Sequence, residues 1–207
     1  MSETIINNKA LIAWRAFTMN RYIVLILSLF LVRCASHGVT MDEKAVQTGY
    51  LFDLHVGMSW TYQVEGEDSK TVTNKITAVR TIGGQQWYKL IEYGDIFWVR
   101  NTERGQVEAA NFFARDPAPE DKPEEALVFK YPVTNGETWD NLESPTTYNG
   151  TEVVTVPAGT FECHIYFIDM GNGSYSKSCI ANNVGVVYNE FVPDEGSKEI
   201  SRLIRYE

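Results

Sequence analysis

Apolar and polar residues alternate along much of the chain, most clearly between Thr160 and Asp169. Every second residue in this stretch is apolar, namely Phe161, Cys163, Ile165 and Phe167. A period of two is typical of a β-strand with one buried face. The pattern therefore predicts a strand here.

Short turn sequences divide the remainder of the C-terminal part into strands. Val156-Pro157-Ala158-Gly159 fits a type I turn, because proline presets the second backbone angle and glycine accepts the left-handed conformation of a following bulge. Further turn sequences are Gly171-Asn172-Gly173, Asn182-Asn183 and residues 193–196. They predict consecutive antiparallel strands at 160–169, 175–180, 185–191 and 199–206.

The N-terminal part shows the same succession of short strands and turns. A strand follows Gly57, and glycine-containing turns separate further strands at 71–79, 85–92, 96–102 and 106–113. Short strands at such spacing are typical of all-β barrels and sandwiches. We predict an all-β fold with a curved antiparallel meander sheet, which forms a half-barrel, a barrel or a sandwich. It occupies a single domain at 50–207 and is preceded by an N-terminal signal helix.

One stretch, Asp116 to Glu125, interrupts the succession of predicted strands. Three prolines and five acidic residues exclude a central strand, so we expect a solvated surface loop. The alternative is a calcium site, but the regular Asp-x-Asp-x-Asp-Gly spacing is absent.

The N-terminal residues have the pattern of an export signal. A basic start at Met19-Asn20-Arg21 precedes the apolar run 22–32 and a small-residue exit. We predict a signal peptide at 1–33, with Met19 as the true start and 1–18 as an upstream extension, followed by a tether at 34–49. The alternative is a buried N-terminal helix. The apolar run is too short to span a bilayer comfortably.

Three cysteines have two expected roles. If Gly171 is the centre of its hairpin, Cys163 and Cys179 lie directly opposite each other, close enough for a disulfide. The alternative is two buried free thiols. Cys34 is then left over. Leu31-Val32-Arg33-Cys34 resembles the lipobox of bacterial lipoproteins, except that Arg33 replaces a small residue, and the resemblance implies lipidation of Cys34.

Four segments carry a wider family resemblance. They are Gly57-Met-Ser-Trp60-Thr-Tyr62, Tyr131-Pro132-Val-Thr-Asn-Gly136-Glu-Thr-Trp139, Val156-Pro-Ala-Gly-Thr-Phe161-Glu-Cys163 and Val184-Gly185-Val-Val. Together they resemble a widespread group of small exported bacterial β-proteins, many of them known only as lipoproteins of unknown function. The resemblance implies a curved antiparallel sheet akin to the half-barrels of bacterial lipoprotein carriers. It brings no catalytic residues.

The net charge and the absence of certain motifs exclude several classes of function. Without residues 1–33 the chain carries 14 basic and 26 acidic residues, a balance that argues against nucleic-acid binding. The sequence lacks a Gly-x-Ser-x-Gly elbow, a phosphate-binding loop, His-Glu-x-x-His and paired Cys-x-x-Cys. Its three histidines, His37, His55 and His164, form no metal-ligand spacing. We therefore expect no enzyme activity, no cofactor and no metal.

Aromatic residues are the remaining candidates for a binding site. Those in predicted strands are Trp60, Tyr62, Trp87, Trp98 and Trp139. Core packing is the ordinary role of such residues. If several line the concave side of a curved sheet, they form an apolar or sugar-stacking pocket.

Three functional hypotheses remain. The first is a non-enzymatic protein of the bacterial cell envelope that binds a partner protein or an apolar ligand, either lipid-anchored on the periplasmic side of a membrane or secreted. The second is a structural or assembly partner of another envelope protein. The third is a carboxylate-dependent hydrolase, which would require a deep pocket with two carboxyl groups of raised pKa.

Overall fold

The fold is all-β, as predicted. The structure is a computed structural model that describes residues 51–66, 69–141 and 144–207. The predicted signal peptide, Cys34 and the tether at 34–49 lie outside these residues. The described residues form twelve strands: β1 (Ser59–Glu65), β2 (Lys70–Ile82), β3 (Gln85–Glu92), β4 (Asp95–Thr102), β5 (Gly105–Ala109), β6 (Glu125–Lys130), β7 (Thr138–Asn141), β8 (Ser144–Val156), β9 (Gly159–Gly171), β10 (Ser174–Ala181), β11 (Gly185–Val192) and β12 (Glu199–Tyr206). A short 3-10 helix, η1 (Ala110–Phe112), precedes β6.

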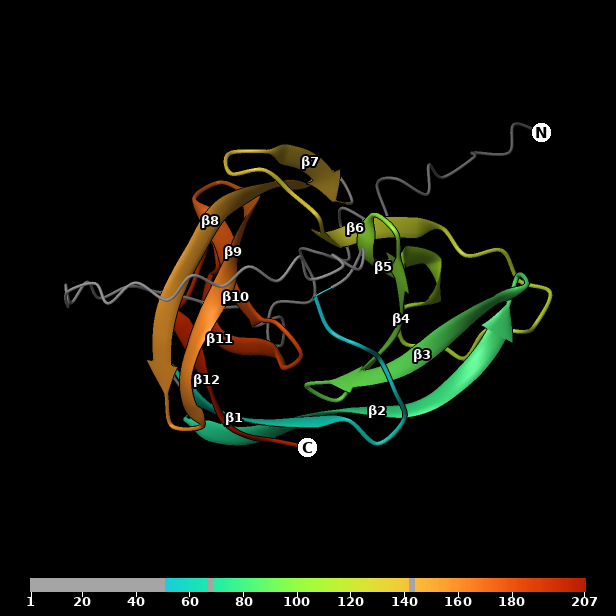
Figure 1. Ribbon diagram of the computed structural model, residues 1–207, viewed down its shortest axis with the longest axis horizontal. Helices are drawn as coiled ribbons and strands as arrows, with labels where there is room; N and C mark the ends of the chain where they lie inside the picture. Colours follow the sequence, from blue (N-terminus) through green and yellow to red (C-terminus); the bar gives the residue numbers. More distant parts are fainter. Residues whose placement is uncertain (1–50, 67–68, 142–143) are drawn as a thin grey trace, which may run out of the picture.

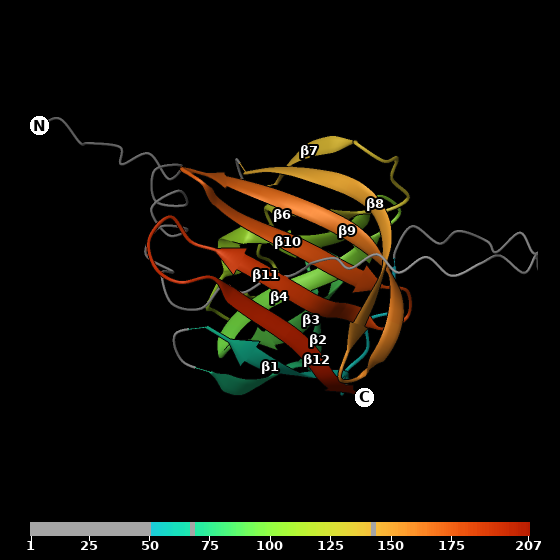
Figure 2. The same ribbon diagram turned by 90° about the vertical axis from the view of Figure 1, so that its left-hand side faces the viewer.

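All twelve strands belong to one antiparallel sheet. Its order is β6-β5-β4-β3-β2-β1-β12-β11-β10-β9-β8-β7, so two meanders are joined where β1 pairs with β12. The sheet curls into a nearly closed barrel, and its edge strands β6 and β7 approach each other at the top of Figure 1. Figure 2 shows β1 and β12 side by side. We call the gap between β6 and β7 the seam.

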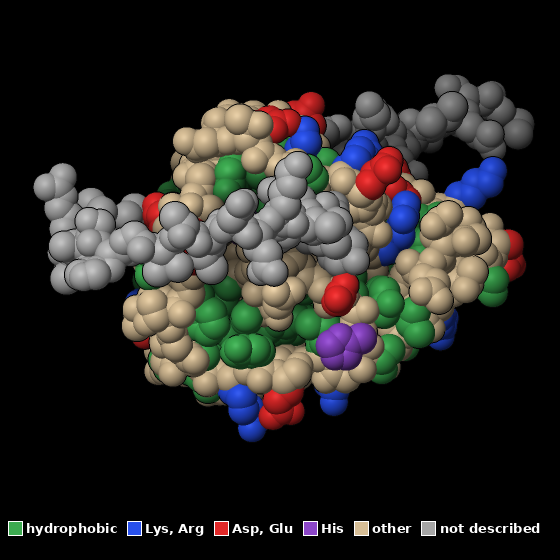
Figure 3. Space-filling view, viewed as in Figure 1, with side chains coloured by type: hydrophobic (Ala, Val, Ile, Leu, Met, Phe, Trp, Pro, Cys, Tyr) green, Lys and Arg blue, Asp and Glu red, His purple; other side chains and the backbone are tan. Residues whose placement is uncertain are grey.

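Residues 51–58 cross one end of the barrel. The Asn101 side-chain amide donates to the carbonyl oxygen of Phe52 (2.7 Å), and the Asn183 backbone amide donates to that of Leu51 (2.9 Å). The segment thus links β4 to the turn between β10 and β11 and buries four apolar side chains, Leu51, Phe52, Leu54 and Met58. In Figure 3, which shows this end of the barrel, hydrophobic side chains gather toward the middle and charged ones lie mainly around the rim.

The sheet has an apolar cluster on each face. Val99 and Trp98 are neighbours on β4 and therefore point to opposite faces. Val99 belongs to the inner cluster, which contains Trp60, Tyr62 and Leu203, whereas Trp98 belongs to an outer cluster beneath η1 and the loop that follows it. The inner cluster is extended by the long β8–β9 hairpin, whose tip bends back so that the Ala158 amide donates to the Leu203 carbonyl (3.0 Å).

The acidic stretch 116–124 is a loop, but it is not simply solvated. Asp116 accepts a hydrogen bond from Lys89 (2.7 Å) and forms an ion pair with Arg80 (3.5 Å). Lys89 lies on β3 and Arg80 on β2, so the loop is held over the outer face of the sheet. The Lys89 hydrogen bond is the main reason that the pKa of Asp116 is lowered.

The predicted register of the β9–β10 hairpin is wrong. Its turn is the two-residue Asn172-Gly173, both at positive φ, and a bulge follows between Ser174 and Tyr175. Consequently Cys179 pairs with Ile165, and Cys163 pairs with Ala181. The two cysteines are diagonal neighbours on one face, not directly opposed residues.

Candidate ligand-binding site

The structure does not bring the five candidate aromatics together. Trp87 and Trp98 are 0% exposed and lie in the outer cluster, where the indole of Trp98 donates to the Arg115 carbonyl (3.0 Å). Arg100 lies over the ring of Trp87, and Arg80 lies over that of Trp98. The proposal that these two tryptophans face a ligand on the concave side is therefore wrong, because they lie buried on the opposite face.

Trp60 and Tyr62 are buried on the inner face of β1. The Trp60 indole donates to the Val184 carbonyl, and the Tyr62 hydroxyl donates to the Val186 carbonyl (2.9 Å). Burial raises the pKa of Tyr62, so its hydroxyl keeps the proton that makes this bond. Both side chains connect β1 to β11 or the turn before it, which is a structural role.

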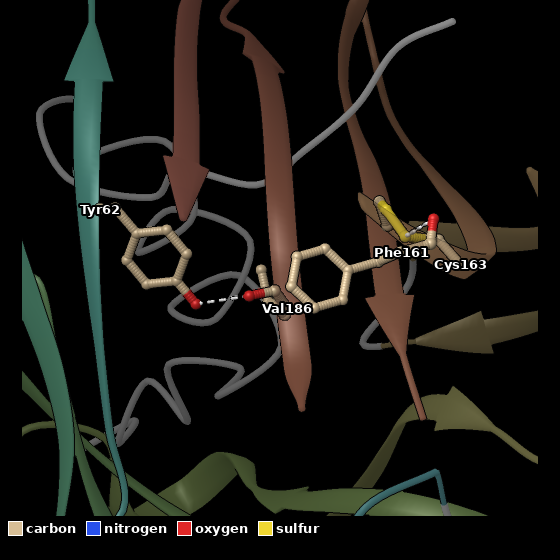
Figure 4. The surroundings of a disulfide bond; sticks show 5 residues. Tyr62, Phe161, Cys163 and Val186 are labelled. Atoms are coloured by element: carbon tan, nitrogen blue, oxygen red, sulfur yellow. Dashed lines mark hydrogen bonds between the residues drawn. A yellow bond between two sulfur atoms is a disulfide. The ribbon is translucent and has the colours of Figure 1, made fainter. Parts of the chain in front are cut away.

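Cys163 and Cys179 are joined by a disulfide, with their Cα atoms 5.2 Å apart. Figure 4 shows its surroundings, in which the rings of Tyr62 and Phe161 lie on either side of Val186. The diagonal arrangement still permits the bond because both side chains lie on the same face of neighbouring strands.

Trp139 is the one candidate aromatic near an opening. It lies half-buried on β7, and its indole donates to the Leu127 carbonyl of β6 (2.9 Å). Its ring also meets Tyr166 edge-on, with the centroids 5.9 Å apart. The side chain thus spans the seam, where backbone pairing between β6 and β7 is absent from the sheet order.

A cleft of about 530 Å³ opens beside the seam. The connection between β6 and β7 forms one wall, and β8 and β9 form the other. Its lining residues are Lys130, Tyr131, Pro132, Val133, Thr134, Glu137, Tyr148 and His164. We call it the seam cleft. In the sequence, residues 131–137 stand out only as part of a family resemblance, and no local pattern marks Lys130, Tyr148 or His164 as lining a cleft.

Two tyrosine rings in the seam cleft contact His164. Its Nδ1 atom lies 2.8 Å from the Tyr148 hydroxyl, and the two rings are stacked with centroids 5.8 Å apart. The Tyr131 ring meets the imidazole edge-on at 5.2 Å. Burial lowers the pKa of His164 and raises that of Tyr148. A neutral imidazole carries one ring proton; in the tautomer with that proton on Nε2, Nδ1 accepts from the Tyr148 hydroxyl and Nε2–H is left as a donor.

Charged groups lie at the rim of the cleft. Lys130 forms an ion pair with Glu137, whose second oxygen accepts a hydrogen bond from the Thr134 amide (3.0 Å). The bond from Lys130 is the main cause of the lowered pKa of Glu137. The pair fixes the 131–137 connection against the end of β6.

A second cluster of polar side chains lies inside the barrel. The Asn74 amide donates to Glu92 Oε1 (3.0 Å), and the Tyr93 backbone amide donates to Asn74 Oδ1 (3.1 Å). The Tyr93 hydroxyl, in turn, lies 2.8 Å from Ser201 Oγ on β12. Burial raises the pKa of Glu92 to about 7. Burial and the charge of Glu92 raise that of Glu108 to about 8.

Residues 51–66, 69–141 and 144–207 contain no group of three or more His, Cys, Asp or Glu residues that could hold a metal ion. Over the same residues, no helix has the length and apolar character needed to cross a membrane.

Comparisons with known proteins give a similarity of shape and nothing more specific. No protein-family model matches the sequence, and no curated protein matches it. The chain is similar to the crystal structure of a putative exported protein with a YMCC-like fold from Bacteroides fragilis, with 14% identity, a TM-score of 0.49, and coverage of 77% of this chain and 99% of that one. It is also similar to a putative lipoprotein from Parabacteroides distasonis, with 14% identity, a TM-score of 0.43 and the same coverage. At this identity and these scores, neither similarity bears on function.

Proposed function

We propose that this chain is an exported, non-enzymatic binding protein of the bacterial cell envelope that takes up an apolar or ring-shaped small ligand in the seam cleft. The observation that carries the proposal is the aromatic wall of Tyr131, Tyr148 and His164 beside a cleft of about 530 Å³. Small-molecule sites usually have such a volume and combine an apolar lining with a few oriented polar groups.

The residues that line the cleft have separate roles in this proposal. The face of Tyr131 is available for stacking, while Tyr148 holds the imidazole of His164 in one orientation. Nε2–H of His164 then offers a directed donor to a ligand oxygen. The Lys130–Glu137 pair already neutralises itself, so a ligand needs no net charge to bind.

Titration of the purified full chain with apolar and ring-shaped probes tests this proposal. Suitable probes are the apolar dye N-phenyl-1-naphthylamine and neutral disaccharides. Tyr131→Ala should weaken binding about fivefold or more, since an aromatic contact of this kind contributes about 1 kcal/mol or more. Tyr206→Ala, which removes an exposed tyrosine on β12, is the matched control and should bind normally. Equal affinity of the two variants would contradict the proposal.

Membrane attachment forms the second part of the proposal. Lipid on Cys34 would hold the domain on the periplasmic side of a membrane through the tether at 34–49. Mass spectrometry of the mature protein should find Cys34 as the first residue, carrying lipid. Cys34→Ser should release the protein from membranes, whereas unchanged fractionation of that variant would exclude a lipid anchor at this position.

A carboxylate-dependent hydrolase is the second candidate function, because Glu92 and Glu108 both have raised pKa values inside the barrel. A carboxyl group with such a pKa can donate a proton near neutral pH. Hydrolysis of chromogenic aryl glycosides by the wild type, lost in Glu108→Gln and retained in Glu120→Gln, would favour it. Absence of turnover across such substrates at pH 6–8 would leave binding as the function.

A further inference from the structure

The connection that forms one wall of the seam cleft is fixed to the sheet by backbone hydrogen bonds at both ends. At its start, the Tyr131 amide donates to the Arg104 carbonyl (3.0 Å). At its end, the Gly136 amide donates to the Tyr148 carbonyl (2.8 Å), and the Tyr148 amide donates to the Glu137 carbonyl (2.9 Å). A ligand therefore meets groups that are already in place, which lowers the entropy lost on binding.

The cleft contains an aromatic ring with a face left over. The Tyr131 ring and the His164 imidazole meet edge-to-face, with their planes 76° apart and their centroids 5.2 Å apart. An edge-to-face pair occupies at most one face of either ring. Among the ring contacts of the described residues, Tyr131 takes part in no other. Tyr131 is half-buried and lines the cleft, so its ring offers a flat apolar surface to a ligand.

The same cleft contains an ion pair with unused hydrogen-bonding capacity. Lys130 bonds to one oxygen of Glu137, and the second oxygen accepts from the Thr134 amide (3.0 Å). The side chains of Lys130 and Glu137 are 31% and 33% exposed, so both keep contact with solvent. An ammonium has three donors and a carboxylate about four acceptor positions, so the pair can make further bonds. His164 adds its Nε2 atom, because its Nδ1 atom is taken by Tyr148.

We propose that the ligand of the seam cleft is a neutral carbohydrate. The apolar C–H face of a pyranose ring stacks on Tyr131, and its hydroxyls bond to the Lys130–Glu137 pair and to Nε2 of His164. Two adjacent hydroxyls suit the ion pair, because each hydroxyl can accept from the ammonium and donate to the carboxylate. This inference rests on the proposed function and narrows its ligand to one chemical class.

The lining residues disfavour the other ligand classes. A wholly apolar ligand would remove water from Lys130 and Glu137 without replacing the hydrogen bonds that the water made, which is costly. Among the described residues that line the cleft, Lys130 is the one basic and Glu137 the one acidic residue, and they pair with each other. An anionic or a cationic ligand would therefore find its counter-charge already taken.

NMR titration of the purified full chain with maltose, cellobiose and diacetylchitobiose at millimolar concentration tests the assignment. At least one of these neutral disaccharides should shift the imidazole resonances of His164. Sucrose octasulfate, a disaccharide in which charged sulfates replace the hydroxyl protons, should not shift them.

The outcomes separate this inference from the proposed function. If no neutral disaccharide shifts the resonances while N-phenyl-1-naphthylamine still binds in a Tyr131-dependent way, the carbohydrate assignment is overturned and the proposed function stands. If neither kind of probe binds, both are overturned.

A charge-pair variant tests the polar contacts. Lys130→Met with Glu137→Gln keeps similar side-chain lengths without the charges, and should weaken binding of the disaccharide found above about tenfold or more, because hydrogen bonds to charged groups are lost. The same variant should bind N-phenyl-1-naphthylamine more tightly, since no ion pair is then covered. This opposite effect also distinguishes loss of contacts from misfolding.

The matched control removes a different ion pair. Arg115→Met with Asp121→Asn acts on an exposed pair (3.2 Å) in the acidic loop and should leave binding of both probes unchanged. Unchanged disaccharide affinity in Lys130→Met with Glu137→Gln would overturn the contacts assigned to the ion pair.

Discussion

The Tyr166 hydroxyl donates a hydrogen bond to the Lys130 backbone carbonyl, 2.9 Å away across the seam. Tyr166 lies on β9 and Lys130 ends β6, two strands that are not neighbours in the sheet. Together with the bond from Trp139 to Leu127, this contact satisfies carbonyl groups of the β6 edge that no adjacent strand pairs. Side chains therefore replace the missing strand ladder where the barrel closes.

Removing one of these bonds should weaken the seam. Tyr166→Phe leaves a carbonyl without its buried partner, and we expect the free energy of unfolding to fall by about 1–3 kcal/mol. Tyr88→Phe is the matched control, because the described residues provide no partner for the Tyr88 hydroxyl, and it should change stability by less than about 0.5 kcal/mol. Urea denaturation measures both, and equal midpoints would contradict the role of Tyr166.

The disulfide should stabilise the folded protein, because it closes a loop in the unfolded chain. Cys163 and Cys179 are 16 residues apart, and a loop of that length corresponds to about 3 kcal/mol in the chain-entropy estimate. The variant Cys163→Ala with Cys179→Ala should lower the free energy of unfolding by about this amount. Cys34→Ser is the control and should leave it unchanged. If added reductant does not shift the wild-type urea midpoint, the bond adds no stability.

Stability should fall as pH rises from about 5 to 8. The folded-state pKa values of Glu92 and Glu108, about 7 and 8, lie above the ordinary value of 4.5. Between these limits the folded chain holds protons that the unfolded chain releases, so each group costs up to about 1.4 kcal/mol per pH unit. The effect should be complete above about pH 8. Urea denaturation at five pH values should show this slope in the wild type, and a smaller one after Glu92→Gln and Glu108→Gln.

His164 should show the opposite dependence on pH. Burial lowers its folded-state pKa below the ordinary 6.5, so the unfolded state binds the proton more readily. Its contribution to stability is therefore complete above about pH 6.5 and is lost as pH falls through the lowered pKa. NMR of the imidazole nitrogens should find a neutral ring at pH 6.5 with the proton on Nε2. A ring protonated at that pH would contradict the donor role assigned to Nε2.

Local sequence patterns predicted the strands but not their long-range pairing. Alternation and glycine turns placed most strands within a few residues of their observed positions, because both signals act over short distances. The pairing of β1 with β12 brings Tyr62 beside Leu203, and no local signal specifies such a contact. The register error in the β9–β10 hairpin arose because Asn172-Gly173 had been interpreted as part of a turn centred on Gly171.

The candidate site was harder to predict than the fold. Trp87 and Trp98 have the pattern of ordinary strand residues, and the sequence does not show that a later loop covers their face of the sheet. Glu92 stands just before a Gly94-Asp95 turn, where an acidic residue usually indicates a solvated strand end. Its inward orientation follows from its alternation with Leu90, whose inner-face position depends on pairing with Ile76 and Phe97. The seam cleft likewise exists only because β6 and β7 meet without pairing.

The position of β12 has a consequence for biogenesis. Among the described strands, the pairing of β1 with β12 is the one that joins the two meanders, so the barrel cannot close until residues 199–206 have been made. A polypeptide emerging from N- to C-terminus would therefore remain two open half-sheets until β12 pairs with β1. Loss of these eight residues would expose both central strand edges at once and convert a closed molecule into an aggregation-prone one.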